Sequence, residues 1–354
     1  MIISRTPYRI SFFGGGTDYP VWYREHSGAV LSTSINKYCY ITCRYLPPFF
    51  NHHSHIVYSR VEAVQSNDEI EHPAVREALK YLSISDGVEI HHDGDLPART
   101  GLGSSSSFTV GLLHSLYALK QQMVTKMQLA TEAIHMERDI LKEHVGSQDQ
   151  ACAAFGGFNR ISFSTDDRLR VDPVIIHQER LWDLENHLML FFTGFSRIAS
   201  HVAKKQIQNT KMKSSELQTM YEMVEEAITL LAGNSDISAF GELLHEGWLL
   251  KRSLSDAIST SDIDEIYSAA RESGAIGGKL LGAGGGGFML LFVPPEDQAH
   301  VRERLNDLLH VPFRFEAGGS QVIFYDPNAY KHSDHPLFSN QTLSARPQEL
   351  VWAY

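Results

Sequence analysis

The segment LPARTGLGSSSSFTV, residues 96–110, contains a Gly-Leu-Gly turn, four consecutive serines and the start of an apolar stretch with helical spacing. Glycines at 101 and 103 let the backbone approach a ligand closely, because glycine has no side chain and adopts conformations that other residues avoid. The helix that begins at the serines offers unpaired N–H groups and a partial positive charge at its N-terminus. This combination predicts a phosphate-binding loop.

An N-capped helix with a serine-rich first turn is the alternative interpretation of the same residues. Four serines are more than capping needs, and a serine hydroxyl can also bind Mg²⁺, which commonly takes one or two protein oxygens with phosphate oxygens and water. The P-loop pattern does not occur in the chain, and no Rossmann glycine pattern lies between a strand and a helix, so those two nucleotide sites are disfavoured. We expect phosphate contacts from Gly101, Leu102, Gly103, Ser104, Ser105, Ser106 and Ser107.

Two further glycine-rich segments suggest places where the backbone approaches something closely. Residues 12–20, FFGGGTDYP, combine three glycines with the carboxylate of Asp18. Residues 282–287, GAGGGG, precede a strongly apolar strand. A loose connection is the alternative for the second segment, since glycine costs ordering entropy whatever its purpose. Five glycines in six residues nevertheless favour a functional loop.

Length and charge limit the classes of protein that remain. The chain has 354 residues, more than the ~250–300 at which a single core stops growing, so we expect two domains, over residues 1–185 and 186–335, and a tail over 336–354. The formal net charge is −11, without a dense Lys/Arg cluster, which argues against nucleic acid and anionic membranes as partners. No apolar run is long enough to span a membrane, and we expect a cytoplasmic protein.

Cysteines and histidines give little sign of a metal site. Cys39 and Cys43 fall on one face of an expected strand, which is typical of buried thiols. The runs HHSH at 52–55 and HH at 91–92 have no second ligand cluster with zinc-site spacing, so we interpret them as solvated loop histidines.

Hydrophobic periodicity predicts a mixed α/β chain. Strands are expected over residues 30–45, 88–92 and 186–193, and helices over 73–82, 105–120, 125–143, 200–231 and 238–255. Residues 277–293, GGKLLGAGGGGFMLLFV, predict the end of a helix, a glycine loop and a buried strand.

Three charged residues lie where charges are unusual. Glu137 falls within the apolar stripe of its expected helix, and a buried carboxylate needs a partner or a cation, so it is a candidate Mg²⁺ ligand. A helix-edge salt bridge is the alternative. Asp149 opens a small-residue segment as either a helix cap or the carboxylate that orients an attacking hydroxyl in phosphoryl transfer. Arg9 is either structural or the cation that keeps Asp149 ionised and offsets phosphoryl charge.

These segments resemble, in order along the chain, the motifs of the GHMP kinases, the superfamily of galactokinase, homoserine kinase and mevalonate kinase. The motifs are PYRISFFGGGTDY, LPARTGLGSSSS, GSQDQ and KLLGAGGGG, within residues 4–295. The resemblance implies an N-terminal α/β domain like domain 2 of ribosomal protein S5, a ferredoxin-like α+β domain and an active site between them. It also implies ATP as phosphoryl donor with Mg²⁺.

The same resemblance implies roles for individual residues. Asp149 matches the catalytic aspartate and Arg9 its basic companion, and whether the aspartate takes the proton or only orients the hydroxyl stays open. Ser105 and Glu137 match the Mg²⁺ ligands of the family, and the glutamate precedes the aspartate by twelve residues as in galactokinases.

Glycine replaces the sugar-binding glutamate of galactokinases in this chain, at Gly15, while Asp18 is kept. The change makes room and removes negative charge, which suits a longer or anionic sugar. The segments GAVLSTSINKYCY and FFTGFSRIAS further resemble the D-glycero-D-manno-heptose 7-phosphate kinases, which phosphorylate an anomeric hydroxyl on the route to nucleotide-activated heptose for bacterial surface glycans.

A phosphorylated sugar substrate would need positively charged side chains of the protein to bind its phosphate. Arginine binds phosphate in bidentate fashion, whereas lysine acts as a point charge. The expected substrate-binding residues are Gly15, Gly16, Thr17, Asp18, Lys37, Arg197, Gly284 and Gly285, with Lys204 as a further candidate. Solvated surface charges are the alternative for Lys37, Arg197 and Lys204.

Other functions stay open on the sequence. A kinase of another sugar, such as a fucokinase, shares the glycine-containing segment. A non-catalytic sugar-sensing relative is a second alternative, which the joint presence of Arg9, Ser105, Glu137 and Asp149 disfavours. A diphosphomevalonate decarboxylase would need a diphosphate-bearing acid, to which nothing in the sequence points. The oligomeric state is open, with a homodimer possible.

Overall fold

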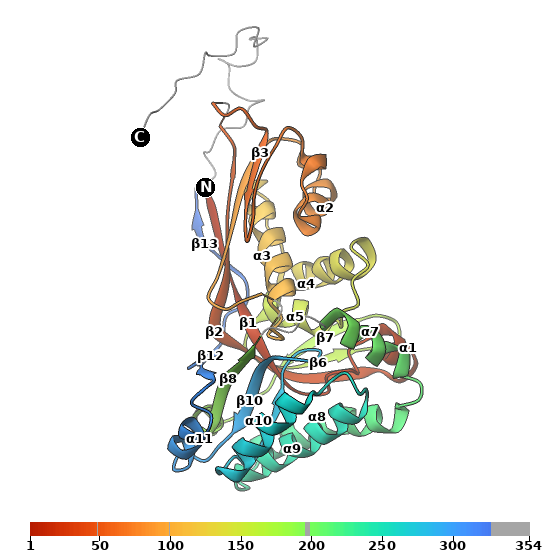
Figure 1. The fold of residues 1–354 in the computed structure, drawn as a ribbon. Coiled ribbons are helices and arrows are strands. Elements are labelled where there is room, and N and C mark those ends of the chain that lie inside the picture. Colours follow the sequence, from red (N-terminus) through yellow and green to blue (C-terminus); the bar gives the residue numbers. More distant parts are fainter. Residues whose placement is uncertain (48, 99, 195–198, 327–354) are drawn as a thin grey trace.

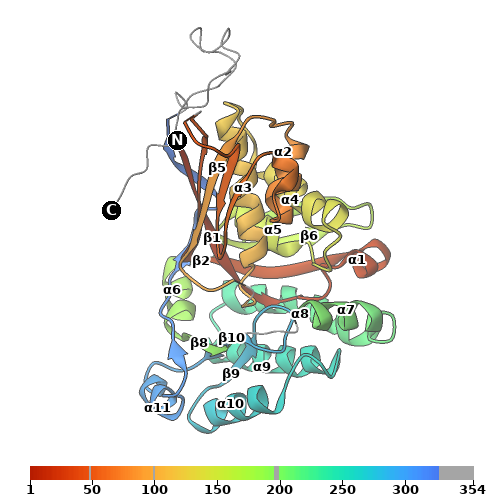
Figure 2. The same cartoon turned by 45° about the horizontal axis from the view of Figure 1, so that its top comes forward.

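The computed structural model describes residues 1–47, 49–98, 100–194 and 199–326, and the side chains within these ranges apart from those of residues 199–201. Arg197 and the expected tail therefore lie outside the described residues. The chain forms two layered units, each built on its own sheet, with the second unit packed against one end of the first (Figures 1 and 2).

The first unit contains a nine-stranded sheet with the main order β13-β1-β2-β5-β3-β4, in which β6 and β12 also pair with β2 and β7 pairs with β6. Its strands are β1 (Ile2–Phe13), β2 (Gly28–Tyr45), β3 (Ser54–Val57), β4 (Val61–Val64), β5 (Val88–Gly94), β6 (Phe158–Phe163), β7 (Leu169–Pro173), β12 (Phe315–Glu316) and β13 (Gln321–Tyr325). The long strand β2 gives most of the sheet its register, since it pairs with β1 along nearly its whole length and also with β5 and β6.

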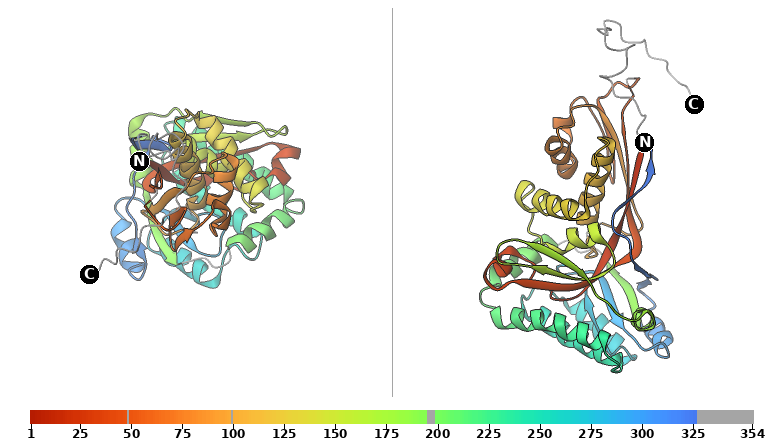
Figure 3. Two further views of the ribbon diagram at one scale, coloured as in Figure 1. Left: turned by 90° about the horizontal axis from the view of Figure 1, so that it is seen from above. Right: turned by 180° about the vertical axis from the view of Figure 1, so that it is seen from behind.

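Helices cover one face of this sheet, as the view from behind shows (Figure 3). They are α2 (Pro73–Tyr81), α3 (Ser104–Leu119), α4 (Lys126–His135) and α5 (Gln148–Phe155), with α1 (Pro20–His26) between β1 and β2 and a short 3-10 helix, η1 (Asn67–Glu69). The apolar side of α3 is buried against β1 and β2. Its N-terminus, where the serines lie, is thereby fixed at the end of the sheet that faces the second unit.

The second unit has a four-stranded antiparallel sheet of order β11-β8-β10-β9. Its strands are β8 (Leu188–Gly194), β9 (Gly277–Leu280), β10 (Gly287–Phe292) and β11 (Leu309–His310), and its helices are α6 (Gln178–Asn186), α7 (Ala199–Asn209), α8 (Ser214–Ala232), α9 (Ser238–Ser253), α10 (Ser261–Glu272) and α11 (Gln298–Arg304). Every residue of β10 is buried. Phe240 of α9 packs edge-on against Phe12 and Phe13 of β1, so aromatic contacts join the two units.

The end of the described chain returns to the first unit. β12 and β13 follow β11 in the sequence but join the nine-stranded sheet, where β13 pairs with β1. The expected division at residues 185 and 335 therefore does not follow the sheets: the segment assigned to the second domain supplies two strands of the first. Antiparallel pairing gives β1 a partner on its outer edge.

Most expected elements are confirmed, with local differences. The helix expected over 125–143 ends at His135 and continues as a π-helical turn, η2 (Met136–Ile140). The helix expected over 200–231 is divided into α7 and α8, and the helix end expected at 277 is instead the strand β9. Cys39 and Cys43 are fully buried, as predicted.

The histidines are not simply in loops. His55 lies on β3 and His91 and His92 lie on β5, all of them half-buried, so that interpretation was wrong for these three residues. The strand β3 was not predicted because its four residues, SHIV, are too few to show a clear apolar alternation. Among the described residues, no helix combines the length and apolar character that a bilayer crossing needs.

Candidate active site

A cavity of about 810 Å³ lies where the two units meet. Its walls come from β1 and the loop after it, the Gly-Leu-Gly turn with the start of α3, residues 142–146, the start of α5, and parts of α7, α9 and the 282–283 turn. The expected residues that line it are Arg9, Gly15, Gly16, Asp18, Gly101, Gly103, Ser104, Ser105 and Asp149. The fold thus collects into one cavity residues from Arg9 to Ala283, and among the expected ones Arg9 and Asp149 are 140 positions apart in the sequence.

Arg9 and Asp149 form a bidentate ion pair in this cavity. Arg9 Nε and Nη2 donate to the two carboxylate oxygens at 2.7 and 2.9 Å, and Nη1 donates to the carbonyl of Gly101 at 2.7 Å. The guanidinium is 4% exposed and the carboxylate 25% exposed. Although burial alone lowers the pKa of Arg9, the neighbouring Asp149 raises it. The pair therefore keeps Asp149 oriented, with one side of its carboxylate facing the cavity.

Asp18 is almost fully buried at another part of the cavity wall. Its carboxylate accepts hydrogen bonds from the Gly16 N–H at 2.8 Å and from Gln148 Nε2 at 3.0 Å. Burial raises its pKa, and the negative charge of Asp149 adds to that effect. A Cβ at position 146 would lie 1.8 Å from Asp18 Oδ2, so Gly146 leaves the space that this carboxylate occupies.

The serine segment is divided between cavity and core. Ser104 and Ser105 line the cavity at the N-terminus of α3. Ser107 is buried and donates to the carbonyl of Pro7, and Leu102 is buried in the core. Ser106 is also buried and donates to Glu137 Oε2 at 2.8 Å. Successive helix residues point about 100° apart, so only some of the four hydroxyls can face the same ligand.

Glu137 lies on η2 and is fully buried, as expected from its position in the apolar stripe. Its Oε2 accepts from Ser106 and from Gln150 Nε2, the latter at 2.5 Å, whereas its Oε1 has no hydrogen-bond partner among the described residues. Burial raises its pKa to about 7. A buried carboxylate oxygen without a partner is costly, and the neighbouring donors are hydroxyl and amide groups. This oxygen-rich surrounding fits a hard cation such as Mg²⁺, although Glu137 itself does not line the cavity.

Two buried lysines also line the cavity, and the sequence analysis did not assign them a role. Lys251, on α9, donates to the carbonyls of Leu280 and Gly282 at 3.1 and 2.6 Å. Lys279, on β9, donates to the carbonyl of Phe12 at 2.5 Å. Burial lowers the pKa of Lys251 to about 8, and burial with the nearby charge of Lys251 lowers that of Lys279 well below its ordinary value. Lys279 could have been recognised as a candidate site residue because it is the one charged residue in the apolar segment GGKLL.

Several expected substrate residues do not line the cavity. The Thr17 hydroxyl donates to the Gly14 and Ala29 carbonyls at 2.8 and 2.9 Å, which gives it a structural role. Gly285 donates its N–H to the carbonyl of Ile258, and Gly284 packs against the same residue. Lys37 lies half-buried at a bulge of β2, and Lys204 is exposed on α7. None of these side chains is part of the cavity wall.

The glycine-rich segment 282–287 instead packs against the Gly-Leu-Gly turn that precedes α3. A Cβ at Gly282 would lie 2.3 Å from the Cα of Gly101, and one at Gly287 would lie 2.3 Å from the carbonyl of Thr100. Gly101 and Gly282 both have positive φ, of 85° and 74°. The 282–287 segment therefore holds the turn before α3 by backbone contact alone, which only glycine permits.

Comparisons with known proteins identify the family. The model for the GHMP kinases N terminal domain matches residues 70–157, and that for GHMP kinases C terminal matches residues 222–311. A D-glycero-alpha-D-manno-heptose 7-phosphate kinase of Campylobacter jejuni is 28% identical over 319 residues, covering 86% of this chain and 93% of the relative. A bifunctional fucokinase/GDP-fucose pyrophosphorylase of Arabidopsis thaliana is 24% identical over 326 residues, which are 85% of this chain and 31% of that protein.

Solved structures show the same fold. A D-glycero-D-manno-heptose 1-phosphate kinase of Bacteroides thetaiotaomicron superposes with a TM-score of 0.76 at 23% identity, covering 92% of this chain and all of that one. Galactokinase of Lactococcus lactis, complexed with galactose, gives a TM-score of 0.71 at 17% identity, with 90% and 94% covered. The family models and the kinase relatives support an ATP-dependent phosphotransferase. The chain belongs to the GHMP kinases, and the fold expected from its motifs is confirmed.

Proposed function

We propose that this enzyme is a sugar kinase that transfers the γ-phosphoryl group of ATP to the anomeric hydroxyl of D-glycero-D-manno-heptose 7-phosphate. The observation that carries the proposal is the buried cation Lys251, which lies with the buried Lys279 in the same cavity as the Arg9–Asp149 pair. A buried cation in a polar cavity suits an anionic substrate, whose phosphate would replace the solvation that burial removes. The relative from Campylobacter jejuni, a heptose 7-phosphate kinase, supports the same substrate class.

In this proposal the cavity holds donor and acceptor on either side of Asp149. The ATP phosphates lie at the N-terminus of α3, against the backbone of Gly101 and Gly103 and the hydroxyls of Ser104 and Ser105. The sugar lies toward Asp18, which accepts hydrogen bonds from its hydroxyls. Asp149 faces the attacking hydroxyl, and Arg9 fixes the orientation of that carboxylate through two hydrogen bonds.

The transfer itself forms one bond and breaks one. The anomeric oxygen attacks the γ-phosphorus, the bond from that phosphorus to the β–γ bridging oxygen breaks, and ADP leaves with the bond electrons. The hydroxyl proton leaves toward Asp149, which either accepts it or orients its departure to solvent. Mg²⁺, held by Glu137 and a serine at the start of α3, would neutralise charge on the ATP phosphates.

The first experiment measures Mg²⁺-dependent ADP release with a panel of D-glycero-D-manno-heptose 7-phosphate, mannose 6-phosphate, mannose, fucose and galactose. Turnover with the heptose phosphate alone, with ³¹P NMR placing the new phosphate at the anomeric position, supports the proposal. Turnover with only a neutral sugar refutes the phosphorylated substrate and leaves the kinase. ATP binding without turnover on any sugar would favour a binding protein.

Variants test the two lysines separately from the chemistry. Lys251→Met is expected to raise KM for the sugar phosphate at least tenfold with little change in KM for ATP, because a buried cation facing an anion is worth roughly 1.5–3 kcal/mol. Lys204→Met, which changes an exposed lysine of α7, serves as the matched control. A kinase for fucose is the second candidate, because of the similarity to the Arabidopsis thaliana fucokinase, and for it Lys251→Met would leave the sugar KM unchanged.

A further inference from the structure

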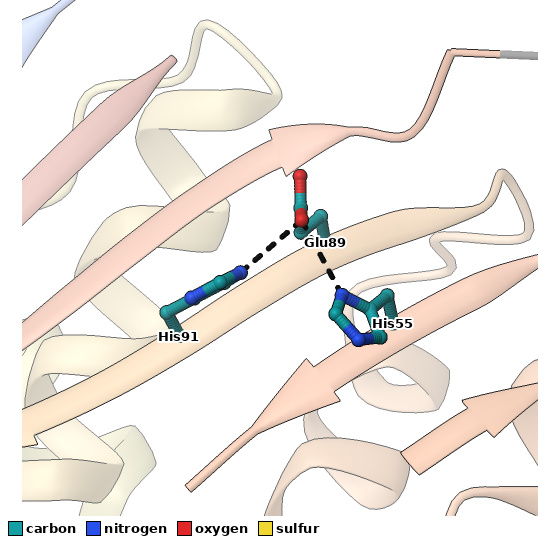
Figure 4. A group of neighbouring side chains, drawn as sticks. All are labelled: His55, Glu89 and His91. Atoms are coloured by element: carbon teal, nitrogen blue, oxygen red, sulfur yellow. Dashed lines mark hydrogen bonds and ion pairs between the residues drawn. The ribbon is translucent and has the colours of Figure 1, made fainter. Parts of the chain in front are cut away.

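Three side chains on the outer face of the first sheet form a cluster unrelated to the cavity. Glu89 and His91 are two residues apart on β5, and His55 is opposite Glu89 on the parallel neighbour β3. Side chains two apart on a strand share a face, and Ile90 and Ile56 point the other way into the core. Figure 4 shows both imidazoles turned toward the same carboxylate.

The distances in this cluster match those of a metal site. His55 Nδ1 lies 3.3 Å and His91 Nε2 lies 3.2 Å from Glu89 Oε1, and the three ligand atoms are all within 4.8 Å of one another. A tetrahedral Zn²⁺ with bonds of ~2.0–2.2 Å has ligand atoms roughly 3.4 Å apart. Two of the three ligand pairs thus already have the required spacing, and small side-chain rotations would bring in the third.

The chemistry of the ligands favours a transition metal over Mg²⁺. Two imidazole nitrogens and one carboxylate oxygen form a donor set suited to Zn²⁺ and its neighbours in the first transition row. In the metal-free protein the imidazoles face one carboxylate oxygen at distances long for hydrogen bonds to a charged group. A metal ion between them would replace these two weak contacts with three bonds, each ring keeping its proton on the other nitrogen.

The carboxylate is held ready for such an ion by Arg44 on β2. Arg44 donates to Glu89 Oε2 at 2.5 Å, on the oxygen that does not face the histidines. Arg44 orients the ligand as outer partners of metal sites do, at the cost of a positive charge nearby.

We propose that His55, Glu89 and His91 bind one Zn²⁺ ion at the outer face of the sheet, with water as the fourth ligand. The exposed fractions of 25, 17 and 40% leave the cluster accessible from solvent. The ion ties β3, which with β4 forms the edge of the sheet, to the more central β5. Its role is to stabilise this edge hairpin, because a ligand that binds only the folded state raises stability.

The test titrates Zn²⁺ into the untagged full-length chain with excess Mg²⁺ present, using a chromophoric chelator as competitor. One equivalent is expected to bind with a micromolar or tighter Kd, and Tm should rise with Zn²⁺. His55→Gln and His91→Gln should each weaken binding at least tenfold, whereas His300→Gln, at an exposed histidine of α11, should not. Kinase activity without added zinc should be the same in all four proteins.

Two results would overturn the proposal: absence of stoichiometric binding, or binding that His55→Gln and His91→Gln do not weaken. Circular dichroism and kinase activity show whether each variant is folded. Because the two histidines lie on different strands, a folding failure in one variant leaves the other informative. The absorption spectrum of the Co²⁺-substituted protein gives an independent readout, since tetrahedral coordination absorbs strongly in the visible and loss of that band in His91→Gln identifies the ligand.

Discussion

Replacing Glu137 by glutamine should stabilise the metal-free protein at alkaline pH while removing its response to Mg²⁺. The folded protein holds this carboxyl at a pKa of about 7 instead of 4.5 because it is fully buried. A raised folded-state pKa means that the native state binds more protons than the unfolded state between these two values. Stability from this group is therefore fully present below pH 4.5 and is lost as pH rises through 7.

The size of the effect follows from the pKa shift. Each pKa unit corresponds to about 1.4 kcal/mol, so the shift corresponds to about 3 kcal/mol of stability. This stability is lost between pH 4.5 and pH 7, and the loss is complete above pH 7. Glutamine has no such titration. Its amide oxygen can accept from Ser106 and Gln150, and its NH₂ then takes the place of Oε1, which already lacks a partner among the described residues. The hydrogen-bond cost is thus similar in both proteins.

The assay is urea denaturation of wild type and Glu137→Gln at pH 5 and pH 8.5, each with and without Mg²⁺ and an ATP analogue. The variant should gain about 2–3 kcal/mol relative to wild type between the two pH values without Mg²⁺, since part of the effect is already lost at pH 5, and Mg²⁺ with the analogue should stabilise only the wild type. Glu272→Gln, at an exposed glutamate of α10, is the control. A stability difference that does not vary with pH would refute the argument, and an unchanged Mg²⁺ response would remove Glu137 from the metal site.

Three further predictions concern the cavity. Asp149→Asn should lower kcat at least about 100-fold while keeping ATP binding, measured by ADP release and calorimetry; near-normal turnover would contradict the role of the Arg9–Asp149 pair. Burial lowers the pKa of Lys251 to about 8, so the folded protein loses this proton at a lower pH than the unfolded chain, and wild-type stability should rise by about 3 kcal/mol from pH 8 to 10.5. KM for the sugar phosphate should increase over the same range because the cation is lost. Lys251→Met should show neither change. Gly146→Ala should displace Asp18, since the added Cβ would lie 1.8 Å from its carboxylate, and raise KM for the sugar without altering KM for ATP; an unchanged KM would show that Asp18 does not contact the sugar.

Local sequence patterns were sufficient for much of the fold and for part of the cavity. Long strands and helices such as β2 and α3 have strong periodicity, and Glu137 was recognisable because an apolar stripe surrounds it. The pairing of Arg9 with Asp149 was one of two interpretations of the sequence, and across 140 positions only the structure shows its bidentate geometry. Short strands such as β3, β9 and β12 depend on partners far along the chain and have little signal of their own.

The substrate side of the cavity was the least predictable part. Lys251 is one of many charges on an amphipathic helix, and only the packing of α9 against β9 turns it inward. Thr17 was expected to bind substrate because it lies between motif residues, but its hydroxyl donates to two backbone carbonyls instead. Which serine donates to Glu137 depends on the rotation of α3 about its axis: Ser106 makes this hydrogen bond, whereas Ser105, the residue that the family resemblance indicates, lines the cavity.

The pairing of β13 with β1 also determines when the enzyme can finish folding during synthesis. The strand β1 leaves the ribosome long before its outer-edge partner, which begins at residue 321. At roughly 5–20 residues per second, the free edge of β1 waits on the order of tens of seconds. The nascent chain must keep that edge from pairing with neighbouring chains until β13 has also emerged, so this kinase should depend on chaperones more than a protein whose first sheet closes early.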